Sequence, residues 1–128
     1  PSSRVVWKGA NVDIPSPVLH KGLLFLVNTK GMATALRAKD GEQVFKGRLE
    51  GRTSAVYASP VDADGRMYVV SRKRGTFVYT ADEDLKLLAR NELDDKTQFN
   101  ASPAVVGNQM FLRSDKRLYC ITQTDSPR

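Results

Sequence analysis

Short apolar runs separated by polar turns recur along the whole chain. The runs are rich in valine, leucine, phenylalanine and tyrosine, and glycine, asparagine, aspartate or serine stands at their ends. Branched and aromatic side chains favour strands, and tight polar turns join strands that run antiparallel. The pattern therefore predicts an all-β protein made of antiparallel strands.

The runs repeat with a period of 43 residues. The tripeptide Ser-Pro-Val at 16–18 returns at 59–61, and Ser-Pro-Ala follows at 102–104. In each copy a glycine, an apolar run, a polar turn and a second apolar run come next. The first of these runs are 23–27, 66–70 and 109–113, and the second are 32–36, 76–80 and 118–121. Self-similarity at a fixed period is the signature of a repeat architecture.

Each repeat has the size of one propeller blade. A further run, at 43–49 and at 85–93, closes the first two repeats, and four antiparallel strands in about 40 to 45 residues are typical of a blade. Runs such as 23–27 are apolar on both faces, as expected where neighbouring blades cover both sides of a sheet. We predict β-propeller blades at residues 16–58, 59–101 and 102–128, the last without its fourth strand.

The segment that follows the third strand of the first repeat points to a family. Residues 35–45 read Ala-Leu-Arg-Ala-Lys-Asp-Gly-Glu-Gln-Val-Phe. Together with the Ser-Pro and glycine signals, this resembles the pyrroloquinoline-quinone-like (PQQ-like) β-propeller repeat, whose pattern is Ala-Leu-Asp-Ala-x-Thr-Gly-x-x-x-Trp. The resemblance covers residues 5–121 and is strongest to the bacterial set related to the outer-membrane assembly lipoprotein. It implies a bacterial protein of the periplasm or cell envelope.

The chain departs from the family pattern at several positions. Arg37, Asp40 and Phe45 stand where the family has aspartate, threonine and tryptophan, and the second repeat has neither the glycine nor the aromatic residue at 81–88. We therefore expect the chain to lack the tryptophan-docking contacts that tie neighbouring blades together in the dehydrogenase branch of the family.

The opening segment matches the fourth strand of a blade. Val5, Val6 and Trp7 align with the run around Phe45, with Trp7 over Phe45, so residues 1–15 are predicted to hold the outer strand of a preceding blade and a loop. Three blades are too few for an ordinary ring, because known propellers have about four to eight. Two arrangements stay open: the chain is the C-terminal part of a larger propeller, or Val5, Val6 and Trp7 complete the last blade of another copy, so that two copies form a six-bladed ring.

The charges are expected to separate onto two rims. The net charge is +6, and turns after the second and fourth strands share one rim of a propeller. We predict that this rim is basic and binds a partner, through Lys30, Arg72, Lys73, Arg74, Lys116 and Arg117, with Arg52 and Lys96 close by. The opposite rim is predicted to be acidic, with Asp40, Glu42, Asp62, Asp64, Asp82, Glu83 and Asp84.

The basic rim permits two interpretations. It is either a docking surface for an acidic protein or peptide, or a solvated surface whose charges keep the loops in water. Nucleic acid is not the expected partner, because no aromatic residues for base stacking alternate with the basic ones.

Several kinds of chemistry are excluded by the residue inventory. The single cysteine, Cys120, rules out an internal disulfide, and the single histidine, His20, rules out a histidine metal cluster and a serine or cysteine triad of the usual kind. Asp-Ala-Asp-Gly at 62–65 predicts a hairpin turn rather than a calcium loop, since no glutamate follows at the required spacing. No catalytic residue, metal ligand or cofactor is predicted, and no apolar run approaches the roughly 20 residues that cross a bilayer.

Two function classes remain. The chain is part of a non-catalytic PQQ-like propeller that acts as a scaffold or binds protein or peptide at a rim or strand edge, or it is part of a quinoprotein dehydrogenase. The dehydrogenase would need aromatic stacking residues and acidic metal ligands near the propeller axis. The innermost runs start with Ser-Pro and offer almost no such groups, so the sequence favours the binding module.

Overall fold

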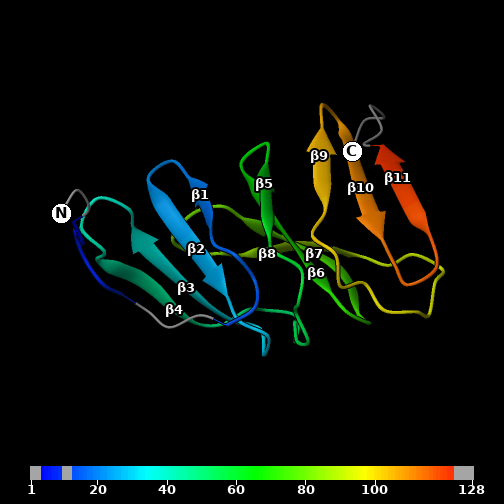
Figure 1. Ribbon diagram of the computed structural model, residues 1–128, viewed down its shortest axis with the longest axis horizontal. Coiled ribbons are helices and arrows are strands. Elements are labelled where there is room, and N and C mark those ends of the chain that lie inside the picture. The colour runs from blue at the N-terminus through cyan, green and yellow to red at the C-terminus, as the bar shows by residue number, and fades with distance from the viewer. Residues whose placement is uncertain (1–3, 10–12, 123–128) are drawn as a thin grey trace.

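Eleven strands in three antiparallel sheets make up the part of the chain that the computed structural model describes, residues 4–9 and 13–122 (Figure 1). No helix occurs among these residues, and so none is present that could span a membrane. The predicted all-β class is confirmed, and the strands form antiparallel sheets of three or four strands each.

Each sheet is one blade, and its strands pair in the order in which they occur in the sequence. Blade 1 contains β1 (Val18–His20), β2 (Leu23–Val27), β3 (Met32–Arg37) and β4 (Gln43–Arg48). Blade 2 contains β5 (Val61–Ala63), β6 (Arg66–Ser71), β7 (Gly75–Thr80) and β8 (Leu87–Asn91). Blade 3 contains β9 (Ala104–Val106), β10 (Gln109–Arg113) and β11 (Leu118–Thr122), without a fourth strand among the described residues.

The first strands of the blades lie side by side. β1 contacts β5, and β5 contacts β9, so these three short strands form the inner edge of the assembly (Figure 1). The longer strands fan out from this edge, because each blade is rotated relative to the one before it.

The opening segment is not a strand. Residues 4–9 have no strand pairing, so the predicted outer strand at Val5, Val6 and Trp7 does not form in this chain. A strand needs a partner with which to exchange backbone hydrogen bonds, and no strand of a preceding blade lies beside this segment among the described residues. The remainder of the predicted segment at 1–3 and 10–12 lies outside the described residues.

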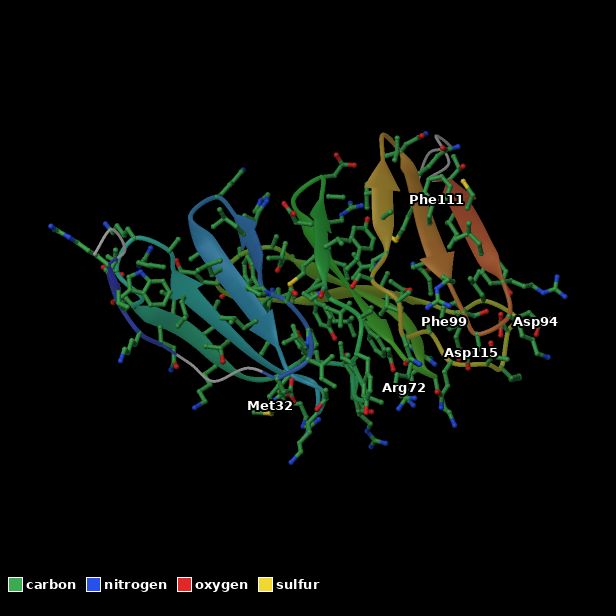
Figure 2. The ribbon with its side chains drawn as sticks, in the orientation of Figure 1. Met32, Arg72, Asp94, Phe99, Phe111 and Asp115 are labelled. Atoms are coloured by element: carbon green, nitrogen blue, oxygen red, sulfur yellow. The ribbon has the colours of Figure 1, made fainter. Side chains whose placement is uncertain are left out.

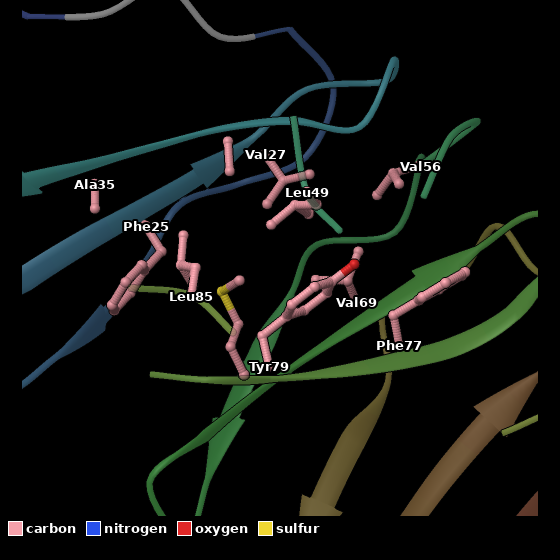
Figure 3. Close-up of a cluster of buried hydrophobic side chains, with 11 residues drawn as sticks. Phe25, Val27, Ala35, Leu49, Val56, Val69, Phe77, Tyr79 and Leu85 are labelled. Atoms are coloured by element: carbon pink, nitrogen blue, oxygen red, sulfur yellow. The ribbon is translucent and has the colours of Figure 1, made fainter. Parts of the chain in front are cut away.

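The main core lies between blades 1 and 2 (Figure 3). Strand pairing puts Phe25 opposite Ala35 in blade 1 and Phe77 opposite Val69 in blade 2. Because successive side chains of a strand point to opposite faces, each blade presents one apolar face to the blade before it and one to the blade after it. This two-sided burial accounts for the runs that are apolar throughout.

Candidate binding rim

The turns that carry the predicted basic residues lie at the same end of the three blades. These turns join β2 to β3, β6 to β7 and β10 to β11, and Figure 2 shows Met32, Arg72 and Asp115 along this end. The blade topology thus places Lys30, the 72–74 turn and the Lys116-Arg117 pair on one side of the molecule. We call this side the basic rim.

Backbone hydrogen bonds fix the spacing of these turns. The loop between two blades donates to the turn of the earlier blade and accepts from the turn of the later one. The bonds at the first junction are Val56 N to Thr29 O (3.1 Å) and Arg72 N to Ala55 O (2.9 Å), and those at the second are Phe99 N to Arg72 O (2.9 Å) and Asp115 N to Gln98 O (2.9 Å). Each donor and each acceptor at the second junction lies 43 residues after its counterpart at the first. The sequence repeat is therefore also a repeat of hydrogen bonds.

A glycine makes the close approach of loop and turn possible. Gly31 has a φ of +83°, and a β-carbon there would lie 1.6 Å from the carbonyl oxygen of Thr53. No other residue fits this position without moving the inter-blade loop.

Arg72 is a structural residue of the rim. Its guanidinium lies 4.3 Å from the centroid of the Tyr57 ring. Its Nε donates to the Asn100 side chain at 2.7 Å, and its Nη2 donates to the Gln98 side chain. Arg72 therefore links both inter-blade loops, and its Nε and one Nη2 donor are used within the chain.

The other predicted rim residues divide into two groups. Arg74 is partly buried, and its Nε is buried with no hydrogen-bond partner among the described residues. The exposed residues are Lys30, Lys73, Lys116 and Arg117, together with Arg52 and Lys96 in the neighbouring loops. None of these six forms an ion pair with a described residue, so their charges face solvent.

The basic rim also contains carboxylates that the sequence reasoning missed. Asp95 accepts hydrogen bonds from the hydroxyls of Thr97, Ser114 (2.7 Å) and Tyr119 (2.7 Å). These bonds, that of Thr97 first, hold the pKa of Asp95 far below its usual range. Asp13 similarly accepts from Thr29 at 2.8 Å, which lowers its pKa. Both carboxylates cap turns, and the Asp-x-Thr spacing at 95–97 is the signal that could have revealed the first of them.

At the opposite rim, several of the predicted acidic residues are paired. His20 Nδ1 lies 3.0 Å from Asp62, and Arg37 lies 3.1 Å from Glu42 and 3.6 Å from Glu83. Asp82 accepts from the hydroxyl of Thr80, which lowers its pKa. Within the described residues, no cluster of three or more metal-ligating side chains is found on either rim.

Serine side chains connect the inner edges of the blades. Ser16 N donates to Ser59 Oγ at 2.8 Å, and Ser59 N donates to Ser102 Oγ at 2.8 Å. The Ser-Pro element of the repeat is thus an inter-blade contact: its hydroxyl accepts the backbone donor of the preceding blade.

Trp7 docks onto blade 1, contrary to the expectation from the sequence. Its Nε1 donates to the carbonyl of Ala38 at 2.9 Å. Its ring lies against Gly41, where a β-carbon would come within 2.7 Å of it. This contact requires the carbonyl of Ala38 and the bare backbone of Gly41, and neither Arg37 nor Asp40 interferes with them. The tryptophan-docking contact is therefore present here in spite of the substitutions.

Blade 2 replaces this glycine with a core residue. Leu85 occupies the corresponding place in the turn before β8, with a φ of +45°, and it is 2% exposed. Phe45, the residue aligned with Trp7, packs at the edge of the cluster that contains Leu85. In the second repeat, the leucine at this position fills space between blades 1 and 2.

A groove of about 800 Å³ separates blades 2 and 3. Its apolar lining includes Val70, Val78, Met110, Leu112 and Ile121. Asp95 and Thr97 lie at the rim end of the groove.

Comparisons with known proteins agree with this architecture. The family model described as "Outer membrane protein assembly factor BamB" matches residues 1–121. The crystal structure of BamB from Moraxella catarrhalis superimposes with a TM-score of 0.76 at 13% identity, covering 94% of this chain and 34% of that one. No curated protein matches the sequence.

Two further solved structures share the fold. The quinohemoprotein alcohol dehydrogenase ADHIIG from Pseudomonas putida HK5 has a TM-score of 0.60 and 16% identity, over 80% of this chain and 16% of that one. The computationally designed Ika4 protein has a TM-score of 0.55 and 9% identity, over 94% of this chain and 98% of that one. This chain thus spans about a third of the BamB structure and about a sixth of the dehydrogenase, and at these identities the likeness concerns the fold.

Proposed function

We propose a binding function for this chain, which belongs to the family described as outer membrane protein assembly factor BamB. In this proposal the three blades are a non-catalytic scaffold of a bacterial cell-envelope protein, and the basic rim binds an acidic segment of a partner protein. The exposed residues Lys30, Lys73, Lys116 and Arg117 make the contacts, and Arg72 holds the two inter-blade loops in place.

The observation that carries the proposal is the fixed spacing of the basic turns. Backbone hydrogen bonds and the Arg72 clamp set the positions of the three turns, while the charged ends of Lys73 and Lys116 remain exposed and unpaired among the described residues. A surface that is already ordered loses less conformational entropy when it binds. Charge complementarity then supplies specificity and a fast association rate.

The inner edge supports a scaffold rather than a quinone-dependent enzyme. Small serines precede the inner strands, and the hydroxyls of Ser59 and Ser102 accept hydrogen bonds from the preceding blade. The likeness to the quinohemoprotein dehydrogenase concerns the fold and adds no catalytic group to this chain.

Charge reversal on one rim at a time tests the proposal. We expect Lys73→Glu/Lys116→Glu to weaken binding of a fluorescein-labelled poly-glutamate peptide about tenfold or more at low salt, because two contacts change from attraction to repulsion. Fluorescence anisotropy measures the affinity.

Lys21→Glu/Lys39→Glu is the matched control, since it changes the net charge equally at exposed positions of the opposite rim. Its affinity should stay within about twofold of the unmodified chain. Equal losses in both variants would show that only net charge matters, and the rim would not be a site. Stoichiometric binding of pyrroloquinoline quinone with calcium, followed by absorbance, would contradict the non-catalytic scaffold.

A further inference from the structure

One aromatic ring faces solvent on the basic rim. Tyr57, in the loop between blades 1 and 2, is 38% exposed, whereas every other phenylalanine, tyrosine or tryptophan within the described residues is buried or half-buried. An exposed ring forgoes the stabilisation that burial of its apolar surface would give. The question is therefore what Tyr57 does at the surface.

Backbone hydrogen bonds place Tyr57 between two of the exposed lysines. The two residues before it bind the turns on either side of the loop. Residue 56 donates to the turn of blade 1 that carries Lys30, and residue 55 accepts from the turn of blade 2 that carries Lys73. Each lysine directly follows the turn residue that makes the bond, so the ring is flanked by a positive charge on each side.

Arg72 holds the ring in position. Its guanidinium lies 4.3 Å from the centroid of the Tyr57 ring, at the end of the blades where Figure 2 labels Arg72. The Nε of the same guanidinium donates to the side chain of Asn100, which occupies the place of Tyr57 in the next inter-blade loop, 43 residues later. A ring that is stacked on a clamped cation loses little freedom when a second group packs against it.

We propose that Tyr57 is the specificity-determining residue of the basic rim and that the partner segment carries an aromatic residue among its acidic ones. This inference rests on the proposed function of the rim. The partner's aromatic ring packs against Tyr57, and the carboxylates on either side of it meet Lys30 and Lys73. The lysines attract any anionic segment, whereas the fixed ring distinguishes one such segment from another.

An aromatic residue suits this contact better than an aliphatic one. Two rings gain interaction energy beyond the area that they bury, because the edge of one ring is attracted to the face of the other. An aliphatic side chain at the same place gains only the burial. The order of preference should therefore be aromatic, aliphatic, then a side chain too small to reach the ring.

Three labelled peptides of equal charge test this order. Each has two glutamates on either side of a central phenylalanine, leucine or alanine, and fluorescence anisotropy at low salt measures its affinity. We expect the phenylalanine peptide to bind about fivefold or more tightly than the alanine peptide, with the leucine peptide between them.

Substitutions at position 57 assign the preference to the ring. Tyr57→Ala and Tyr57→Asn, the second taking the residue that the next loop has at Asn100, should bind the three peptides alike, with the affinity for the alanine peptide within about twofold of the unmodified chain. Tyr57→Phe keeps the ring and should keep the preference. Leu88→Ser, at an exposed apolar position of β8 outside the basic rim, is the matched control and should change none of the affinities.

The outcomes separate this contact from the proposed function of the rim. Binding of poly-glutamate without any preference among the three peptides would overturn this contact alone, and so would a preference that survives in Tyr57→Ala. A ring-free variant that is folded by circular dichroism but loses affinity equally for all three peptides would make Tyr57 a support of the rim and not a recognition residue. Absence of binding by poly-glutamate and by all three peptides would overturn the proposed function and this contact with it.

Discussion

The two junctions between blades have the same backbone plan but different packing. At both, the inter-blade loop makes the same pair of backbone hydrogen bonds, and a serine hydroxyl accepts from the preceding blade. Among the described residues, the first junction buries eleven apolar residues in one cluster, whereas the second buries four and keeps a groove of about 800 Å³. The repeat therefore sets the spacing of the blades without setting how well their faces fit.

Side-chain size explains the difference. At the first junction, Phe77 and Tyr79 of blade 2 lie in a cluster with the small side chains of Ala33 and Ala35 of blade 1, and all four are almost fully buried. Leu85 fills the remaining space from the turn before β8. Large side chains that pack among small ones produce the dense core typical of folded proteins.

At the second junction the corresponding positions are less well filled. Tyr119 and Ile121 take the places of Phe77 and Tyr79. The Tyr119 hydroxyl donates to Asp95 at the rim, and Ile121 is 37% exposed. Part of the hydrophobic contact is thus replaced by a polar network at the surface.

The largest expected difference between the junctions comes from a matched pair of leucines. Leu49, which follows β4, is 1% exposed in the first cluster, and Leu93, which follows β8, is only partly buried in the second. We expect Leu49→Ala to lower the free energy of unfolding by about 2–5 kcal/mol, and Leu93→Ala by roughly half as much or less. Urea denaturation measures both. Equal losses would mean that the two junctions contribute equally to stability.

A smaller effect is expected from the buried tyrosine of the first junction. The Tyr79 hydroxyl donates to the carbonyl of Glu50 at 2.6 Å and contacts the Thr53 hydroxyl. We expect Tyr79→Phe to cost about 1 kcal/mol of unfolding free energy, because Thr53 still reaches the Glu50 carbonyl at 3.3 Å.

The same tyrosine predicts sensitivity to alkaline pH. Burial raises the pKa of Tyr79 to about 12. The pKa is raised in the folded state, so the stabilisation is fully present below the unfolded value of about 10 and is lost as the pH rises toward 12. Phenolate absorbance and circular dichroism should show unfolding in this window, and the Tyr79→Phe variant should be less sensitive there. If both proteins lose the same stability at alkaline pH, the titration of another group causes that loss.

The smallest expected effect is a change in stability at acidic pH, and it comes from Asp95 at the second junction. Hydrogen bonds from Thr97, Tyr119 and Ser114 lower the pKa of Asp95. Its contribution to stability is therefore present above its unfolded pKa of about 3.9 and is lost as the pH falls below that value. Asp95→Asn should flatten the dependence of the thermal midpoint on pH between about 4 and 2 and change it little at pH 7. Parallel curves for the two proteins would exclude Asp95 as the group responsible.

Much of the fold could be predicted from the sequence, because its signals are local. The Ser-Pro elements, the glycines before β2 and β6 and the short apolar runs predicted the strands in their observed order. The docking of Trp7 was predicted wrongly. The departures at Arg37, Asp40 and Phe45 predicted its loss, but the contact is made by the carbonyl of Ala38 and the backbone of Gly41.

The candidate rim was predicted in outline but not residue by residue. Lys73 and Lys116 are exposed as a binding rim requires, whereas Arg72 and Arg74 are drawn into the structure. No sequence pattern distinguishes them, because the partners of Arg72 come from loops of both neighbouring junctions. The caps at Asp13 and Asp95 were missed for a similar reason, since the hydroxyls of Thr29 and Tyr119 reach them from other turns.

The sequence by itself determined the class of the fold and the number of repeats. It also determined that the basic turns lie at the same end of the three blades. Strand periodicity and turn residues act over a few neighbours, and copies of them in register define a repeat. Only the tertiary structure decided that the first junction is dense and the second open, that Leu85 fills the space between blades 1 and 2, and that Arg72 is a structural residue while Arg74 is partly buried. These outcomes depend on the volumes and hydrogen-bonding groups of residues that are distant in the sequence, such as Arg72 with Gln98 and Asn100, and such residues meet only after the blades have packed.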